Sequence, residues 1–186
     1  MDEAKTRECL SLMNNYGFAI GEAYAVVYGG ENYEDVRAKK VKHEKSFALL
    51  EKKNSEWPMP KVIWDLAPEH WHLSMDGHDV QSFRLKFPDA AVMSVKTSQL
   101  SNILAAHSRR LGDPFSPNYR SKSAALVVHL QEGGRVSPAM TLLDAGGLHV
   151  VGGNHRLGWA MYLKQEEIPI LIRSLDRKEI EELLKT

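Results

Sequence analysis

Five consecutive residues, Gly152-Gly153-Asn154-His155-Arg156, have the side chains and spacing of an anion-binding turn. Two glycines let the backbone approach an anion closely, and the first N–H groups of a following helix lack partners within that helix. A phosphate can accept several of these N–H groups at once, and the helix dipole favours its charge. Asn154 can cap the helix, Arg156 offers a fork of donors, and His155 can donate a hydrogen bond or move a proton. The run predicts a phosphate site, and a well-made turn without a ligand is the alternative.

A group of three histidines, His70, His72 and His78, superficially resembles a set of zinc ligands. The pair Asp76-Gly77 between them is a strong signal for a two-residue β-hairpin. In that register His78 faces the opposite side of the hairpin from the other two histidines, so the pairing argues against a shared metal. We therefore expect no metal site from these residues.

A basic segment, residues 37–53, contains seven Lys or Arg and only two Glu, with neither proline nor glycine. It reads as part of a helix over residues 31–53, on which Lys39, Lys42 and Lys45 share one side. Such a side can bind the phosphate backbone of DNA, and a solvated helix face is the alternative.

The sequence LHVVGGNHRLGWA at residues 148–160, followed by the apolar run 168–172, resembles the signature stretch of the ParB/sulfiredoxin superfamily. Val92-Met93-Ser94-Val95 resembles the first strand of that family, and residues 121–132 with the following Gly-Gly-Arg resemble its helix and the approach to its next strand. The similarity covers residues 91–173. It implies a small α+β fold in which the turn holds nucleotide phosphates, a role assigned to Gly152, Gly153, Asn154, His155 and Arg156.

The resemblance implies further site residues and cofactors. Lys122 aligns with a basic residue that helps to bind phosphate in sulfiredoxins, and members of the superfamily use ATP or CTP, which we expect here with Mg²⁺. Asn154 stands where sulfiredoxins have their catalytic cysteine, so sulfiredoxin activity is excluded. Glu132 and His155 are the candidate catalytic residues, Glu132 as a general base or Mg²⁺ ligand, with an ordinary helix-end carboxylate as the alternative. Asp144 could also hold a metal, but a hairpin turn already favours aspartate.

One branch of the superfamily, the plasmid fertility-inhibition factors of the oncogenic-suppression type, combines such a domain with a similar length. The resemblance to it implies an ATP-binding phosphohydrolase, with DNase activity as a second expectation, that blocks transfer of another plasmid's DNA through a type IV secretion system. Expected partners are a nucleotide, DNA, and a secretion component or the transferred DNA–protein complex. The alternatives are a non-catalytic inhibitor that uses the fold as a protein-binding scaffold, and a small-molecule kinase. We expect Arg156→Ala to lose nucleotide binding while staying folded.

Periodicity and turn signals predict the elements that position these residues. We expect an α+β, ParB/sulfiredoxin-like fold over residues 89–186 and an N-terminal α/β extension over residues 1–88. Helices are predicted at residues 2–14, 31–53, 97–109, 121–131 (capped by Ser121), 155–164 and 176–185. Strands are predicted at residues 19–28, 61–66, 91–95, 139–143, 148–151 and 168–172, the last at a sheet edge or beginning near Pro169.

The composition is that of a soluble globular protein. The chain has 186 residues, 43% of them hydrophobic, and its 24 basic residues balance 24 acidic ones, so any contact with nucleic acid needs a local basic patch. The single Cys9 excludes an internal disulfide and a cysteine-based zinc site, and it suits a reducing compartment. The longest apolar run, residues 124–130, is far short of the ~20 residues of a membrane span. An acidic start without a signal-peptide pattern adds to the expectation of a cytoplasmic, bacterial protein without membrane insertion.

Overall fold

A computed structural model describes residues 2–108 and 113–185 of the chain. Contacts divide the chain into two compact units, residues 1–48 and 49–186. Residues 49–88, which the sequence analysis assigned to an N-terminal extension, therefore group with the second unit. The described part of the first 88 residues contains helices and no strand, so the expected α/β character of the extension is wrong. None of the helices in the described ranges is both long and apolar enough to cross a membrane.

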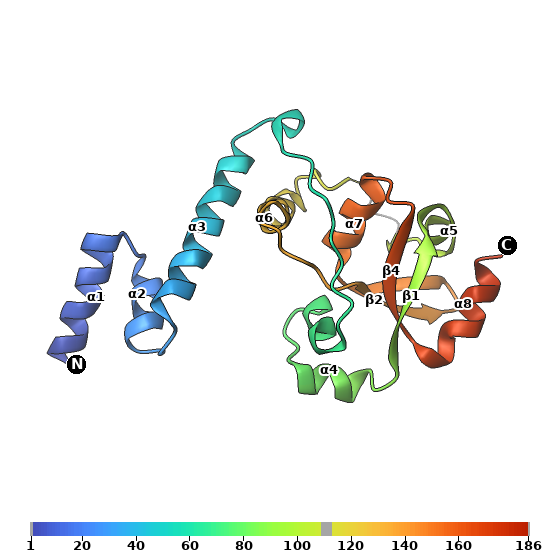
Figure 1. The fold of residues 1–186 in the computed structure, drawn as a ribbon, viewed down its shortest axis with the longest axis horizontal. Helices are drawn as coiled ribbons and strands as arrows, with labels where there is room; N and C mark the ends of the chain where they lie inside the picture. The colour runs from blue at the N-terminus through green and yellow to red at the C-terminus, as the bar shows by residue number, and fades with distance from the viewer. Residues whose placement is uncertain (1, 109–112, 186) are drawn as a thin grey trace. The chain divides into compact units, whose positions relative to one another are not determined.

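The first unit consists of helices α1 (Glu3–Tyr16) and α2 (Ile20–Val27) and most of α3 (Tyr33–Leu50) (Figure 1). Asp2 caps α1 by accepting hydrogen bonds from the first-turn N–H groups, and Gly17 ends it in the left-handed conformation. The predicted strand at residues 19–28 is wrong because these residues form α2. Glu22 accepts the N–H of Ala19 at 2.7 Å and so fixes a helical start.

A small core holds this unit together. The short apolar run of α2 buries Ala23 completely, whereas Tyr24 stays largely exposed. The packing of one helical face therefore determined that this segment is a helix, although its β-branched and aromatic residues suit a helix or a strand. Buried residues from all three helices and the intervening turn form the cluster: Cys9, Leu12, Phe18, Ala23 and Val36.

Residues 49–88 contain 3₁₀ helices η1 (Asn54–Glu56) and η2 (Pro68–Ser74) and helix α4 (Val80–Lys86). The predicted strand at residues 61–66 is wrong, since only Trp64 makes a β-bridge, to Val136. The predicted hairpin across Asp76-Gly77 is also wrong. Gly77 has a positive φ of 78°, but the turn joins η2 to α4, which Asp79 caps through the Ser82 N–H at 2.7 Å.

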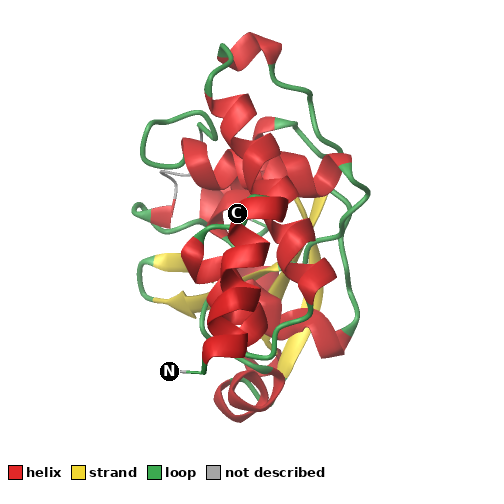
Figure 2. Cartoon of the chain, turned by 90° about the vertical axis from the view of Figure 1, so that its left-hand side faces the viewer, coloured by secondary structure: helices red, strands yellow, loops and turns green. Residues whose placement is uncertain are grey.

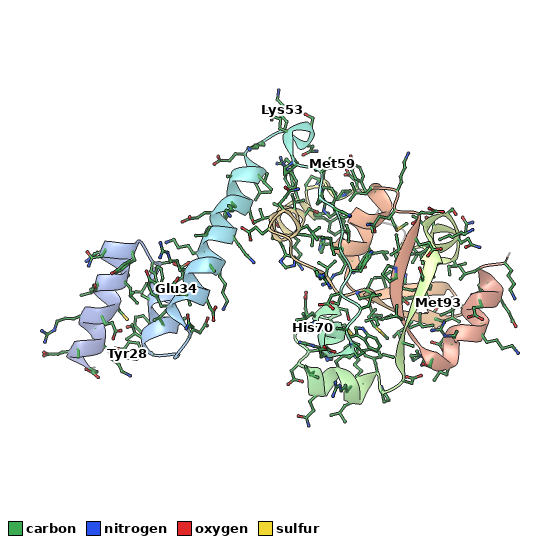
Figure 3. The ribbon with its side chains drawn as sticks, viewed as in Figure 1. Tyr28, Glu34, Lys53, Met59, His70 and Met93 are labelled. Atoms are coloured by element: carbon green, nitrogen blue, oxygen red, sulfur yellow. The ribbon has the colours of Figure 1, made fainter. Side chains whose placement is uncertain are left out.

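Two histidines of this segment make separate local contacts. His70 (labelled in Figure 3) lies on η2 with Nδ1 2.7 Å from the Asp65 Oδ2, and the ring of His72 bonds the carbonyl of Glu69. Within the described residues no group of three His, Cys, Asp or Glu could hold a metal ion.

The second unit is α+β, with one four-stranded mixed sheet and helices around it (Figure 2, strands in yellow). Its strands are β1 (Ala90–Lys96), β2 (Ala139–Asp144), β3 (Gly147–Gly152) and β4 (Glu167–Arg173), in the order β1-β4-β2-β3. Pairing is antiparallel for β1–β4 and β2–β3 and parallel for β2–β4.

Strand β4 lies inside the sheet, so the edge position suggested by Pro169 is wrong. Pairing with β2 begins only at Ile170, which means that no ladder bond to β2 requires the N–H that Pro169 lacks. Alternate residues of β4 face two different cores, and both faces of the strand are buried. The apolar run 168–172 is therefore typical of a central strand.

Two layers cover the sheet. On one face Ile168, Ile170 and Ile172 pack in the main core with helices α5 (Thr97–Ile103), α6 (Arg120–Gln131), α7 (Asn154–Tyr162) and α8 (Arg177–Leu183). Helix α8 follows the 3₁₀ turn η4 (Ser174–Asp176). On the other face Leu171 and Met140 pack against Phe83 and Phe87 of the α4 region, with Trp71 and Met75 at the margin. The part of this segment from η2 to Phe87 thus covers one face of the sheet, whereas Leu49, Trp57 and Val62 pack in the main core on the other.

Two predicted helices differ at their ends. Helix α5 stops at Ile103, six residues before the predicted end at 109, which itself lies outside the described residues. The chain instead runs beside β3, where the N–H of Ala105 bonds the carbonyl of Leu148. Helix α6 begins one residue earlier than predicted, with Tyr119 at the N-cap and no side-chain capping bond, so Ser121 is not its cap.

Candidate functional site

A tight turn joins the end of β3 to the start of α7. Gly153 has φ +83° and occupies the N-cap position, where a Cβ would lie 2.9 Å from the Cα of Ala139. A Cβ on Gly152 would collide with the carbonyl oxygen of Ser74. Both glycines are therefore required by close backbone approach, and Gly153 also by its left-handed conformation.

A cavity of about 410 Å³ opens at this turn. Its lining joins the five residues of the turn and the end of β3 to one residue of α6 and to the end of η2 with the two residues after it. The lining residues are Ser74, Met75, Asp76, Lys122, Val151, Gly152, Gly153, Asn154, His155 and Arg156. All six predicted nucleotide-binding residues thus lie around one cavity, although Lys122 is thirty residues from Gly152 in the sequence.

The start of α7 supplies backbone donors to this cavity. The helix has no side-chain cap, and the first cap-type bond runs from the Leu157 N–H to the Gly153 carbonyl at 3.1 Å. Asn154 is the first residue inside the helix, so its predicted capping role is wrong. The first-turn N–H groups have no acceptor within an α-helix and lie at its positive end. This end of α7 can therefore receive an anion.

Arg156 is held by the protein itself. One guanidinium nitrogen donates to both the carbonyl (3.1 Å) and the hydroxyl (2.8 Å) of Ser137, and the other donates to the carbonyl of Leu73 at 3.0 Å. Burial lowers the pKa of Arg156, and Asp76 opposes that effect. Three of its five donors are thus committed to the fold, which leaves two for a ligand.

Lys122 and Asp76 stand at the mouth of the cavity. The ammonium nitrogen of Lys122 lies 3.9 Å from Oδ2 of Asp76, and their side chains are 64% and 100% exposed. An ion pair so exposed contributes little to stability, and both side chains can move to meet a ligand. Each is therefore available to a charged ligand.

His155 favours its neutral form. Burial is the main cause of the lowered pKa of His155, and the charges of Lys122 and Arg156 lower it further, against the opposing effect of Asp76. The ring packs edge-to-face on Tyr119, with centroids 5.4 Å apart. A neutral imidazole at the wall of the cavity can accept a proton.

Ser74 adds a buried hydroxyl to the wall. The residue is 2% exposed, and its Oγ has no hydrogen-bond partner among the described residues. A buried polar atom without a partner costs free energy, which a ligand or a water molecule in the cavity would recover. Sequence reasoning missed Ser74 and Asp76 as site residues, because the predicted hairpin placed them in a different structure.

The other predicted site residues lie elsewhere. Glu132 is the exposed C-cap of α6, about 15 Å along the helix from Lys122, and does not line the cavity. Lys39, Lys42 and Lys45 belong to α3, which the sequence analysis predicted as a helix. Lys39 pairs with Glu31 at 2.8 Å, and this contact raises its pKa.

A second polar cluster lies on the β2–β3 hairpin. His149 Nδ1 is 2.7 Å from His107 Nε2, and its Nε2 is 2.6 Å from Asp144 Oδ2 without the alignment of a hydrogen bond. The Gly146 N–H is the main cause of the lowered pKa of Asp144, and His149 and His107 add to it. The predicted hairpin already made Asp144 and His149 neighbours, but His107 comes from a loop whose path the sequence did not indicate.

The cavity combines helix N–H groups, one mobile ammonium, one partly committed guanidinium, a hydroxyl, a neutral imidazole and one carboxylate. This donor-rich set suits a ligand with several anionic oxygens. Comparison of the chain with models of protein families, with curated proteins and with solved structures found no match.

Proposed function

We propose that this protein binds the phosphates of a nucleotide, ATP or CTP, at the start of α7, and that it hydrolyses the terminal phosphate in the manner of a ParB/sulfiredoxin-like phosphohydrolase. One observation carries the proposal. The glycine turn, the first turn of α7, Lys122 and His155 all line the same cavity of about 410 Å³.

Electrostatics of the cavity support a phosphate ligand. Lys122 and Arg156 carry two positive charges against the single carboxylate of Asp76 among the lining residues. The positive end of α7 adds to this balance, and partial burial strengthens the interactions of Arg156, whereas Lys122 and Asp76 are exposed to solvent. A phosphate that enters would satisfy the first-turn N–H groups and approach Lys122.

Residues of the cavity also suit hydrolysis. The lowered pKa of His155 favours the neutral imidazole, which can take the proton of a water molecule as its oxygen attacks the terminal phosphate and the nucleoside diphosphate leaves. Mg²⁺ fits as part of a nucleotide complex, since it uses one or two carboxylates together with substrate phosphates, and Asp76 supplies one. When bound, the ion would neutralise phosphate charge. Glu132, outside the cavity, has no part in this mechanism.

The first test compares binding and hydrolysis of ATP and CTP, with and without Mg²⁺, by the wild type, Lys122→Ala and His155→Ala. We expect Lys122→Ala to weaken nucleotide binding and His155→Ala to slow turnover with a smaller effect on affinity. Lys178→Ala, which changes an exposed lysine of α8, is the matched control. Equal affinity in all variants would refute the proposed site.

The proposed cellular role follows the resemblance: inhibition of plasmid transfer through a type IV secretion system. A non-catalytic inhibitor that uses the same fold as a scaffold is the competing function. Nucleotide binding without turnover above the His155→Ala level would favour that scaffold.

DNA is the second proposed ligand, contacted through Lys39, Lys42 and Lys45 on α3. Glu31 and Asp35 border the same face, so the basic surface is partly neutralised. Reversal of the three lysines to Glu is expected to weaken DNA binding and to flatten its salt dependence. If the variant binds DNA as the wild type does across a salt series, the basic side of α3 is only a solvated helix face.

A further inference from the structure

Asp76 is the only acidic residue in the lining of the phosphate cavity within the described chain. It comes from the turn after η2, far in sequence from the glycine turn that it faces. Its carboxylate lies 3.9 Å from the Lys122 ammonium, and its negative charge also acts on His155 and Arg156. An acidic group at this place repels a phosphate that has no bound metal ion.

The backbone that carries Asp76 is fixed against the start of α7. Arg156 donates to the carbonyl of Leu73 at 3.0 Å, and Gly152 leaves just enough room for the carbonyl of Ser74. Met75 packs against the cluster that contains Phe83, Phe87, Met140 and Leu171. The position of Asp76 relative to the phosphate site is therefore set by the fold, whereas its side chain is 100% exposed and can rotate.

A carboxylate held beside a phosphate site has two opposite effects. It repels a phosphate that arrives without a metal ion, because two negative charges that share one cavity raise the free energy of the complex. It attracts a phosphate that arrives with Mg²⁺, since that ion binds one or two carboxylates together with phosphate oxygens and keeps the rest of its water. The same side chain can thus distinguish the two forms of one ligand.

We propose that Asp76 makes the cavity selective for a polyphosphate presented as its divalent-metal complex over the metal-free polyphosphate. The inference rests on the proposed phosphate site and adds to it a residue that determines specificity. Asp76 contacts the metal side of the complex, while the start of α7 and Lys122 contact its phosphate oxygens. When the Asp76 carboxylate rotates from the Lys122 ammonium to the metal ion, Lys122 becomes available to the phosphate.

The test measures affinity for ATP by calorimetry, once with EDTA and once with excess Mg²⁺, so that no turnover is required as a readout. We expect the wild type to bind the Mg²⁺ complex more tightly than metal-free ATP. Asp76→Asn should bind metal-free ATP roughly three- to tenfold more tightly than the wild type and lose most of the Mg²⁺ dependence. Glu69→Gln, which changes an exposed carboxylate on the preceding 3₁₀ helix η2, is the control and should behave like the wild type.

An unchanged ratio of the two affinities in Asp76→Asn would overturn the inference and leave the proposed phosphate site standing. Wild-type affinity for ATP that equals that of Lys122→Ala under both conditions would overturn the phosphate site, and the inference with it. Asparagine retains the size of the side chain in an exposed turn, and tryptophan fluorescence verifies that the variant is folded.

Discussion

Removal of the Arg156 side chain is expected to destabilise the second unit as well as to change its cavity. Ser137 is 2% exposed and would lose the donor to both its carbonyl and its hydroxyl. Leu73 is 56% exposed, so its carbonyl can bond water instead. The expectation that Arg156→Ala loses nucleotide binding while staying folded therefore requires that the stability of the variant is measured as well.

The magnitude follows from these bonds. A hydrogen bond from a charged donor contributes about 1.5–3 kcal/mol, so the two bonds to Ser137 contribute about 3–6 kcal/mol together. Burial lowers the pKa of Arg156, which means that the folded state partly desolvates this charge, and its removal recovers some of that cost. We expect Arg156→Ala to lower the free energy of unfolding by about 2–4 kcal/mol.

Urea unfolding followed by tryptophan fluorescence measures this loss. The four tryptophans, at positions 57, 64, 71 and 159, all belong to the second unit, so the signal reports on that unit alone. Ser137→Ala and the double variant complete a double-mutant cycle that isolates the bond to the Ser137 hydroxyl, because the alanine variant keeps the carbonyl that also accepts from Arg156. A loss below about 0.5 kcal/mol for Arg156→Ala would refute a structural role for the guanidinium, and absence of coupling would refute a contribution of the hydroxyl bond.

Three further outcomes are expected. Gly153→Ala should destabilise the unit by about 1–3 kcal/mol in urea, because the new Cβ meets Ala139 and the φ of +83° disfavours a side chain. The pKa of His155 is lowered in the folded state, so the contribution of His155 to stability is complete above the unfolded pKa of ~6.5 and is lost as pH falls through the folded pKa. An NMR titration of the imidazole measures this pKa, and a normal or raised value would contradict the prediction. Asp176→Ala should cost about 2 kcal/mol in thermal or urea unfolding, since buried Asp176 accepts two bonds from Arg173, at 2.8 and 2.9 Å, between β4 and α8; an unchanged midpoint would speak against it.

Local sequence patterns predicted most of the second half of the chain. The hairpin of β2 and β3, the strands β1 and β4, and the helices α6, α7 and α8 all lie close to their expected positions. In β1, Met93 (labelled in Figure 3) and Val95 are buried and Ser94 between them is exposed, which is the alternation of a strand. These elements were predictable because glycine turns and apolar periodicity act locally and agree with the packing.

Residues 19–28 and 61–80 could not be predicted in this way. The apolar content of residues 19–28 suits a strand, but these residues form a helix that buries Ala23 in the core of the first unit. Asp76-Gly77 is a residue pair typical of a hairpin turn, yet η2 and α4 form on either side of it. Trp71 and Phe83 can then cover the face of the sheet that carries Met140 and Leu171. Tertiary burial overrode the local preference in both places.

The candidate site divides along the same line. The sequence by itself determined the glycine turn at residues 152 and 153 and the helix start that follows it, where we propose that an anion binds, since these depend on backbone conformation and on unpaired helix N–H groups. Only the tertiary structure brought Asp76 and Ser74 to that turn, removed Glu132 from it and gave most of the Arg156 donors to Ser137 and Leu73. Charge and hydrogen bonding in the cavity depend on distances across the fold, which no spacing along the chain specifies.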